Sequence, residues 1–578
     1  MRKKIAKRKS KLGIIAMCLT MAVVMGTTVG CGKNPFISGN EEVDSSKTQI
    51  YVGTLNQGFG KAWLEEAAAR FTELKKDESY ESGKKGVQIF VDSLNIGNQI
   101  IGSVSNERSE IIFNESIDYY AWVQRGLVKD ITKYVKSDLS EYGDEAGSTI
   151  ESKLYSAAKD YYFYEGKYYG IPFYESTFGV IYDIDVFSDN NLFMDKNGEF
   201  ALSSQSDPNA SAGPDGDAST VIDNGLPATY SEFFALCDKI KKNSKLQPFT
   251  WTGQYPLYLS RMVQSMSMYL DGYTQSQSKF KLSGTINTID SFDQSTPVVT
   301  EKKITKDNGY ETFASEGMYY ALEFLQGLYD GKYYVEEYLN SNAYSHLSAQ
   351  NDFVTNNTRT TSNSIKRDVA MLVDGTWFMN EAAGTLTALA KRDPEAGANE
   401  RRFGLMPLPH PDGWESKKYT YLDTNFASCF VTAQTADWKM DLIGEFLKFL
   451  HSDAELRKFT ESTSTLRGFD YVTDWDTSSA NLTPYAQQLI SLRKYIGDDV
   501  VYPISSNQLY ANNITVLCTE LTDFFSATIG NNTYNNPFTA MSGGSKISAR
   551  SYFNGMKNYH NASWWKKTFG SYLSGMGV

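Results

Sequence analysis

The stretch EIIFNESIDYYAWVQRGLVKDI (residues 110–131) carries the pattern that decides the fold. It opens with an apolar run at 111–113, continues through polar residues, and then repeats apolar side chains at helical spacing up to residue 131. A short continuous apolar run is typical of a strand that is covered on both faces, as in a parallel sheet. We therefore expect a strand, a loop and a helix here, which is the unit of an α/β protein.

Further units of this kind follow along the chain. A strand at 50–52 precedes a helix in which Trp63, Leu64 and Phe71 recur at helical spacing. Thr229, with Glu232 three residues later, has the pattern of a capping box and predicts a helix that begins at Tyr230. The other expected elements are strands at 87–91, 179–182 and 369–373 and a helix at about 438–451.

The chain has 578 residues, of which 41% are apolar and 21% charged, so it can form large cores and is too apolar for a disordered protein. It contains 56 basic and 68 acidic residues. Seven of the basic residues lie within the first twelve positions, so residues 31–578 hold 49 basic against 68 acidic residues, a net charge of −19. This charge disfavours binding to nucleic acid or directly to an anionic membrane surface.

The first 31 residues have the layout of a bacterial export signal: a basic cluster, an apolar run at 12–25, and small residues. The sequence TVGC (28–31) resembles a lipobox, with Thr28 where leucine is usual, and predicts cleavage before a lipidated Cys31. A membrane-spanning anchor is the alternative, but the apolar run is short for a span of ~20 residues. Polar residues 32–47 are expected to form a flexible tether.

Cysteines and histidines give no sign of a disulfide framework or a metal centre. Cys237, Cys429 and Cys518 are far apart in apolar surroundings and are expected to be buried free thiols. The four histidines are isolated, and no cofactor is expected. The loop Asp-Lys-Asn-Gly-Glu at 195–199 has calcium-like composition, but its glycine comes too early for an EF-hand, so an ordinary turn is favoured.

Two polar segments, 188–224 and 274–308, interrupt the repeating pattern. They are rich in Asp, Asn, Ser, Thr, Lys and Gly, and we expect surface insertions that bury little core.

Five segments together resemble the extracellular solute-binding lipoproteins of bacterial ABC sugar importers, the family that includes maltose-binding protein. They are residues 110–131, the pair YEGKYYGIPFYE (164–175) and GVIYDIDVF (179–187), PATYSEF (227–233), DVAMLVDGTW (368–377) and RFGLMPLP (402–409). Their order is that of the family, and they follow a lipobox. The resemblance extends from residue 48 to about 460, and it is loose over the last hundred residues.

The resemblance implies an α/β, two-lobed periplasmic-binding-protein-like fold of type II, whose interleaved lobes are joined by three crossings. We expect lobe 1 at 48–177 plus 431–480 and lobe 2 at 178–430 plus 481–578. The crossings are expected near 175–179, 427–432 and 470–485. The implied function is capture of an oligosaccharide in the cleft between the lobes by a lipid-anchored protein on the outer face of the cell membrane. It would pass the sugar to ABC permease subunits, work as a monomer and perform no chemistry.

A sugar ring needs polar partners for its hydroxyls and a flat aromatic surface for its C–H face. Loops at strand ends that combine aromatic residues with acids or amides are therefore candidates, and the chain has 38 Tyr, 32 Phe and 9 Trp, most of which are expected to fill cores. Trp377 is the strongest candidate for stacking. The candidate ligand-binding residues implied by the family's loop positions are Asn56, Gln57, Phe59, Asn114, Glu115, Asp118, Glu175, Trp251, Gln254, Tyr255, Tyr258, Trp377, Arg467, Tyr510 and Asn513.

Each candidate also has a structural reading. Asn114 and Asp118 suit the N-cap of a helix, Glu175 can be a solvated carboxylate, and Trp377 can be a core residue. Three other functions stay open: a lipid-anchored glycan-active enzyme, the same fold binding a peptide or polyamine, and a sensor. No nucleophile motif, metal site or phosphate loop supports the enzyme.

Overall fold

The computed structural model describes residues 42–56, 58–94, 108–115, 119–339, 341–355, 358–360, 363–423, 427–502 and 524–575. Residues Asp44–Val578 form one compact unit. The signal segment, the lipobox and Cys31 lie outside the described residues. No described helix combines the length and the apolar character needed to cross a membrane.

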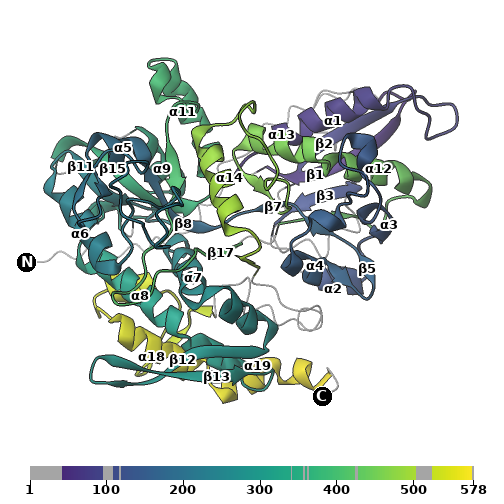
Figure 1. The fold of residues 1–578 in the computed structure, drawn as a ribbon. Coiled ribbons are helices and arrows are strands. Elements are labelled where there is room, and N and C mark those ends of the chain that lie inside the picture. Colours follow the sequence, from purple (N-terminus) through teal and green to yellow (C-terminus); the bar gives the residue numbers. More distant parts are fainter. Residues whose placement is uncertain are drawn as a thin grey trace, which may run out of the picture. The chain divides into compact units, whose positions relative to one another are not determined.

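The first of two large sheets has the strand order β2-β1-β3-β18-β6. β1 pairs in parallel with β2 and β3, whereas β18 pairs antiparallel with β3 and β6. The expected parallel sheet is therefore mixed, because β18 enters from a distant part of the chain. Figure 1 shows helices α12 and α13 beside α1, although more than 350 residues separate them in the sequence. The bounds are β1 Thr48–Leu55, β2 Val87–Leu94, β3 Ile111–Asn114, β6 Ile171–Pro172, β18 Ser428–Val431, α1 Ala62–Leu74, α2 Tyr119–Gln124, α3 Thr132–Val135, α4 Ser156–Tyr162, α12 Met440–Leu450 and α13 Asp453–Thr463.

The second sheet has the order β11-β15-β8-β16 and is also mixed. β11 is parallel to β15, and β8 is antiparallel to both β15 and β16. All six residues of β8 are buried, as its apolar sequence leads one to expect. The bounds are β8 Phe178–Asp183, β11 Leu246–Thr250, β14 Thr358–Thr360, β15 Asn363–Gly375, β16 Phe403–Leu405, α5 Ile184–Asp189, α6 Tyr230–Lys242, α7 Leu257–Lys281, α9 His346–Thr355, α10 Phe378–Glu381, α11 Ala383–Ala390 and α14 Pro484–Ile496.

The polar segment 274–308 contains the end of α7, at 274–281, and a long antiparallel hairpin of β12 and β13, and is not a loose insertion. It buries Ile286 and Ile289 of β12 and Ile304 of β13, and β12 packs against α7 and α8. The expectation that this segment buries little core is therefore wrong. Figure 1 shows the hairpin next to the C-terminal helices. The bounds are β12 Gly284–Asp293, β13 Thr296–Ile304, α8 Glu316–Asp330, β21 Ala527–Ile529, β22 Asn532–Tyr534, α17 Pro537–Ser542, α18 Ala549–Tyr559 and α19 Ala562–Gly575.

Several local predictions are confirmed. Thr229 and Glu232 form the expected capping box at the start of α6. Cys237 and Cys429 are buried free thiols, whereas Cys518 lies outside the described residues. The remaining short strands are β4 Phe163–Tyr164, β5 Lys167–Tyr168, β7 Tyr174–Glu175, β9 Phe193–Met194, β10 Phe200–Leu202, β17 Tyr421–Leu422, β19 Leu466–Arg467 and β20 Val500–Val501.

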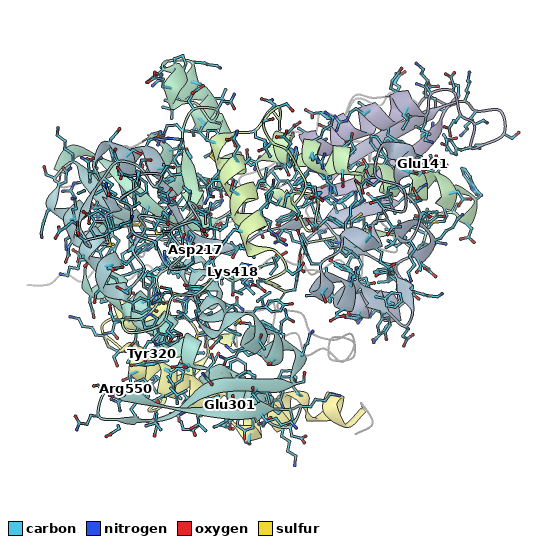
Figure 2. The ribbon with its side chains drawn as sticks, in the orientation of Figure 1. Glu141, Asp217, Glu301, Tyr320, Lys418 and Arg550 are labelled. Carbon is cyan, nitrogen blue, oxygen red and sulfur yellow. The ribbon has the colours of Figure 1, made fainter. Side chains whose placement is uncertain are left out.

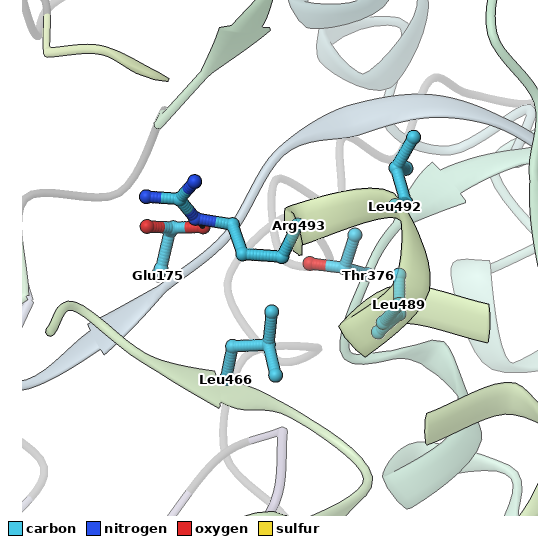
Figure 3. Close-up of a pocket in the computed structure, with 6 residues that line it drawn as sticks. All are labelled: Glu175, Thr376, Leu466, Leu489, Leu492 and Arg493. Carbon is cyan, nitrogen blue, oxygen red and sulfur yellow. Dashed lines mark ion pairs between the residues drawn. The ribbon is translucent and has the colours of Figure 1, made fainter. Parts of the chain in front are cut away.

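The chain passes between the two sheets at β7 and β19, which pair with each other. Glu175 at the end of β7 is fully buried and faces Arg493, which extends from α14. Figure 3 shows the two side chains together in a small pocket that Thr376 and three leucines also line. Glu175 is therefore not the solvated carboxylate that one sequence reading allowed, and it forms a buried ion pair with Arg493. The exact lobe boundaries stay predictions.

Candidate functional site

The candidate site lies where a strand of each sheet ends. Glu115 follows β3 of the first sheet, and Asp374 and Gly375 end β15 of the second. In open α/β sheets, ligands bind outside the carboxyl ends of the strands, where loops present polar groups. Side chains that follow β3 and β15 can therefore converge on one ligand.

Glu115 is held at this place by Tyr174. The Tyr174 hydroxyl donates a hydrogen bond to the Glu115 carboxylate. Burial raises the pKa of Glu115 to about 7, the Tyr174 hydrogen bond lowers it, and the carboxylate of Glu381 raises it. The electrostatic influence of Glu381 links the end of β3 to helix α10, which follows β15.

Asp374 and Glu381 are joined by one amide. Gln350 Nε2 donates to Asp374 Oδ2 at 3.0 Å and to Glu381 Oε2 at 2.6 Å. The backbone N–H of Gly375 donates to Asp374 Oδ1 at 2.7 Å. Burial raises the pKa of Asp374 well above its ordinary value, and the nearby Glu381 raises it further. Together with Glu115, these groups make a site rich in hydrogen-bond acceptors.

Aromatic rings stand beside the carboxylates. Tyr258, at the start of α7, packs edge-on against Phe178 with ring centroids 5.0 Å apart and stacks with His346 at 6.0 Å. Tyr255 stacks with Tyr258 at 6.4 Å and is 42% exposed, so its ring is accessible. Burial raises the pKa of Tyr258, and the charges of Asp374, Glu381, Tyr255 and Glu115 raise it further.

Trp377 forms another part of the aromatic wall. Its ring packs edge-on against Phe178 at 4.9 Å and is 9% exposed. The loop after β1 passes over it: a Cβ placed on Gly58 would lie 3.8 Å from Trp377 Cδ1. Gly58 has φ +63°, a left-handed conformation that favours glycine. The first-sheet loop and the second-sheet tryptophan are therefore in contact distance of each other.

The structure brings together only part of the predicted residue set. Glu115, Tyr255, Tyr258 and Trp377 meet at the site. Asn56 and Gln254 are exposed near the ends of their loops, and Asn114 is buried within β3. Gln57, Asp118, Tyr510 and Asn513 lie outside the described residues.

Other predicted residues pack into cores. Phe59 has ring contacts at 4.7 Å with Tyr174 and 5.4 Å with Phe459, and it is 9% exposed. Trp251 is 3% exposed and packs on Phe249 and Phe538 among others. Trp251 offers almost no surface to a ligand in this structure, and Phe59 is no more exposed than Trp377.

Arg467 is a buried cation held by other parts of the chain. Its Nη2 lies 2.8 Å from His451 Nε2, its Nε donates to the carbonyl oxygen of Phe173, and five aromatic rings surround its guanidinium. Burial lowers the pKa of Arg467 to about 10. The arrangement is that of a structural residue, because cation–π and hydrogen-bond contacts replace its hydration.

Sequence reasoning missed Tyr174, Gln350, His346, Asp374 and Glu381 as members of the site. The sequence pattern could have indicated Asp374, which lies at the end of a strand, and Glu381, which lies four residues after Trp377. It could not have indicated Gln350 and His346, because they reach the site from α9 through tertiary packing. Over the described ranges, no three His, Cys, Asp or Glu side chains form a group that could hold a metal ion.

Comparisons with known proteins agree with this architecture. The family described as bacterial extracellular solute-binding protein matches residues 96–483. Among solved structures, a chitin oligosaccharide binding protein is 12% identical over 89% of this chain and 98% of that chain, with a TM-score of 0.50. The solute-binding protein RafE in complex with raffinose is 13% identical over 89% and 100%, with a TM-score of 0.51.

A structure reported for xylan utilization by the thermophilic bacterium Caldanaerobius polysaccharolyticus is 13% identical over 89% of this chain and 100% of that chain, with a TM-score of 0.51. No curated protein sequence matches significantly. Identities this low show the fold, which is the two-lobed periplasmic-binding-protein-like α/β fold that the sequence predicts. Because the family match covers more than half of the chain, this protein belongs to the bacterial extracellular solute-binding proteins.

Proposed function

We propose that this protein captures an oligosaccharide at the site of Glu115, Asp374 and Glu381 and delivers it to an ABC importer. The observation that carries the proposal is the combination of three carboxylates and an amide with the rings of Tyr255, Tyr258 and Trp377. Carboxylate and amide groups hydrogen-bond sugar hydroxyls, and aromatic rings pack on the C–H face. The neighbours that bind raffinose and chitin oligosaccharide have the same fold, which supports a sugar ligand here.

Closure of the two lobes is the proposed binding step. β7 and β19 are each two residues long and pair only with each other, so they make a narrow connection. A ligand that contacts both Glu115 and the α10 side binds the closed state better and shifts the population toward it. Small-angle scattering checks this: the radius of gyration falls on saturation with the right sugar, and an unchanged radius contradicts closure.

The proposed cellular setting is the outer face of the cell membrane. Cys31 carries the lipid, residues 1–30 are removed, and polar residues 32–47 tether a monomeric binding protein near the permease subunits. The order of basic, apolar and small residues before Cys31 supports this part. The protein binds its ligand without performing chemistry on it.

A cationic ligand, such as a polyamine, is the second candidate. One observation favours it: Gln350 bridges the carboxylates of Asp374 and Glu381, whose only close basic neighbour among the described residues is His346, at 3.9 Å from Glu381. A cation would be attracted to such a group.

A thermal-shift screen with neutral oligosaccharides, polyamines and short peptides separates the ligand classes. Ligands raise the melting temperature by mass action, so a rise with neutral oligosaccharides alone supports the proposal. A rise with polyamines alone favours the second candidate. Chromatography of the incubated sugars tests for an enzyme, since shortened products would contradict a purely binding role.

A further inference from the structure

The loop at 211–224 contains a second concentration of oxygen atoms, apart from the candidate sugar site. Two short segments lie alongside each other in it. The Gly225 N–H donates to the Ser211 carbonyl oxygen at 2.9 Å, and the Asp215 N–H donates to Asp223 Oδ2 at 2.9 Å. Gly213 is so close to Asp223 that a Cβ on it would lie 2.2 Å from the Asp223 carbonyl oxygen. Residues 211–215 and 223–225 therefore form one compact seam.

Four side-chain oxygens along this seam are buried and have no hydrogen-bond partner. They are Ser211 Oγ, Asp215 Oδ2, Asp223 Oδ1 and Asn224 Oδ1. Asp223 is 1% exposed and Asn224 is 6% exposed. Buried polar atoms in folded proteins almost always have partners, so several unpartnered oxygens in one loop indicate a bound ion or ordered water.

Electrostatics favours a cation. The pKa of Asp223 is raised to about 7, chiefly by burial; the Asp215 backbone N–H lowers it, and the carboxylates of Asp215 and Asp217 raise it. Among the residues that the structure describes, no Lys, Arg or His forms an ion pair with any of the three. A buried carboxylate without a counter-ion either takes up a proton or binds a cation.

The other charged and titratable groups around the loop do not supply that cation. Lys417 donates its backbone N–H to the Pro214 carbonyl oxygen, but its ammonium donates to the Leu270 carbonyl oxygen and lies over the Trp414 ring. Tyr495 forms a hydrogen bond with the Asp215 carboxylate, and the charge of Asp223 acts on Tyr182 and Tyr269, but phenolic hydroxyls are neutral at neutral pH and supply no positive charge.

The spacing of oxygen-bearing side chains suits calcium. Asp215 and Asp223 stand eight residues apart, the spacing of positions one and nine of an EF-hand loop. Asp217 and Ser219, at positions three and five, are exposed and hydrogen-bond each other, and the EF-hand glycine and glutamate at positions six and twelve are missing. Calcium accepts six to eight oxygen ligands and mixes carboxylates with amide, hydroxyl and carbonyl oxygens. A site made of two carboxylates and several neutral oxygens does not require three acidic side chains close together. No such group of three occurs among the described residues.

We propose that the 211–224 loop binds a calcium ion through the Asp215 and Asp223 carboxylates, with neutral oxygens of Ser211 and Asn224 beside them and Asp217 adding negative charge (Asp217 is labelled in Figure 2). The ion ties the insertion to the second sheet. Tyr182 of β8 donates to Gln205 Oε1 at 3.0 Å, and Gln205 Nε2 donates to the Asn224 carbonyl oxygen at 3.2 Å. Calcium at Asp223 therefore stabilises a loop that Gln205 connects to β8.

The test compares the wild type with Asp223→Asn and, as a matched control, Asp195→Asn. Asn at position 223 keeps an oxygen for the Asp215 N–H and removes the buried charge, so the variant folds without metal. Asp195 belongs to the exposed turn at 195–199, where its carboxylate accepts N–H groups of Asn197 and Glu199. Melting temperatures are measured with 5 mM calcium and with a chelator. This calcium concentration exceeds the dissociation constants of about 10⁻⁴ to 10⁻³ M found in extracellular sites.

Calcium is expected to raise the melting temperature of the wild type and of Asp195→Asn by several degrees and to leave Asp223→Asn unchanged. Terbium in place of calcium is expected to luminesce on excitation of the nearby Tyr269 and Tyr495, and at least tenfold less in Asp223→Asn. No calcium effect and no terbium signal in the wild type would mean that water satisfies these oxygens and would overturn the proposal. An unchanged calcium effect in Asp223→Asn would overturn it as well.

Discussion

The guanidinium of Arg493 lies 3.1 Å from the carboxylate of Glu175, and both side chains are at most 3% exposed. Glu175 ends the β7 crossing, whereas Arg493 belongs to α14, which packs on β16 of the second sheet. The same guanidinium lies 4.0 Å from the centroid of the Tyr155 ring. The pair thus joins a crossing segment, a helix and an aromatic residue at the point where the lobes connect.

Arg493→Met is expected to destabilise the protein by about 3 to 5 kcal/mol, because it leaves the Glu175 charge buried without a partner. Burial raises the pKa of Glu175 and Arg493 lowers it, so the variant raises this pKa further. A carboxyl group whose pKa is raised in the folded state makes the free energy of unfolding fall as pH rises. Arg493→Met should therefore lose more stability, relative to the wild type, at pH 8 than at pH 5. Urea denaturation at both pH values measures it.

The control is the double variant Glu175→Gln with Arg493→Met, which removes both charges and should lose less stability than Arg493→Met alone. If the single variant is as stable as the wild type at pH 8, the ion pair does not hold the crossing.

Glu115 should give the protein a pH-dependent stability. Its pKa is about 7 in the folded protein, chiefly because of burial, against about 4.3 in an unfolded chain. The folded state therefore binds more protons between these values, so the free energy of unfolding falls as pH rises from about 4.3 to about 7 and then levels off. Denaturation curves at pH 5, 6, 7 and 8 are expected to show a shallower slope for Glu115→Gln than for the wild type. Equal slopes would show that Glu115 is not buried in solution.

Trp377 is 9% exposed and packs on Phe178, so Trp377→Ala should lower stability by roughly 3 to 5 kcal/mol through the cavity that it opens. Trp377→Phe keeps a ring against Phe178 and should lose less. Melting temperature and sugar affinity are measured for both. A fall in both quantities indicates that the ring supports the site and also contacts ligand, whereas a fall in melting temperature with unchanged affinity would identify Trp377 as a core residue only.

The lipoprotein proposal predicts a mature chain that begins at a lipidated Cys31. Mass spectrometry of the protein from the membrane fraction should find the diacylglyceryl-modified cysteine and no peptide from residues 1–30. Cys31→Ser should release the protein from the membrane or leave it unprocessed. A mature N-terminus elsewhere, or an unmodified thiol at Cys31, would contradict lipidation.

The repeating apolar strands and helices, the capping box of α6 and the family resemblance were enough to predict the two-lobed α/β fold, because these signals are local. Strand-end reasoning also singled out Glu115 and Trp377, whose roles in binding stay predictions. It could not show that Phe59, Trp251 and Arg467 are buried, since an aromatic or charged residue near a strand end can face a core as well as a cleft. Gln350 and His346 come from a helix distant in sequence, and only tertiary packing brings them to the site.

Calorimetric titration of the wild type and Tyr255→Ala with a panel of neutral oligosaccharides tests the central claim most directly. Tyr255 is 42% exposed, so removing its ring should leave the melting temperature nearly unchanged. If the ring packs on a sugar, its loss costs on the order of 1 to 3 kcal/mol of binding, or about ten- to a hundredfold in affinity. We predict saturable one-to-one binding of at least one oligosaccharide by the wild type and this weakening in the variant. Binding of no neutral sugar, or equal affinity of the two proteins for the sugar that binds, would contradict an oligosaccharide site at Tyr255 and its neighbours.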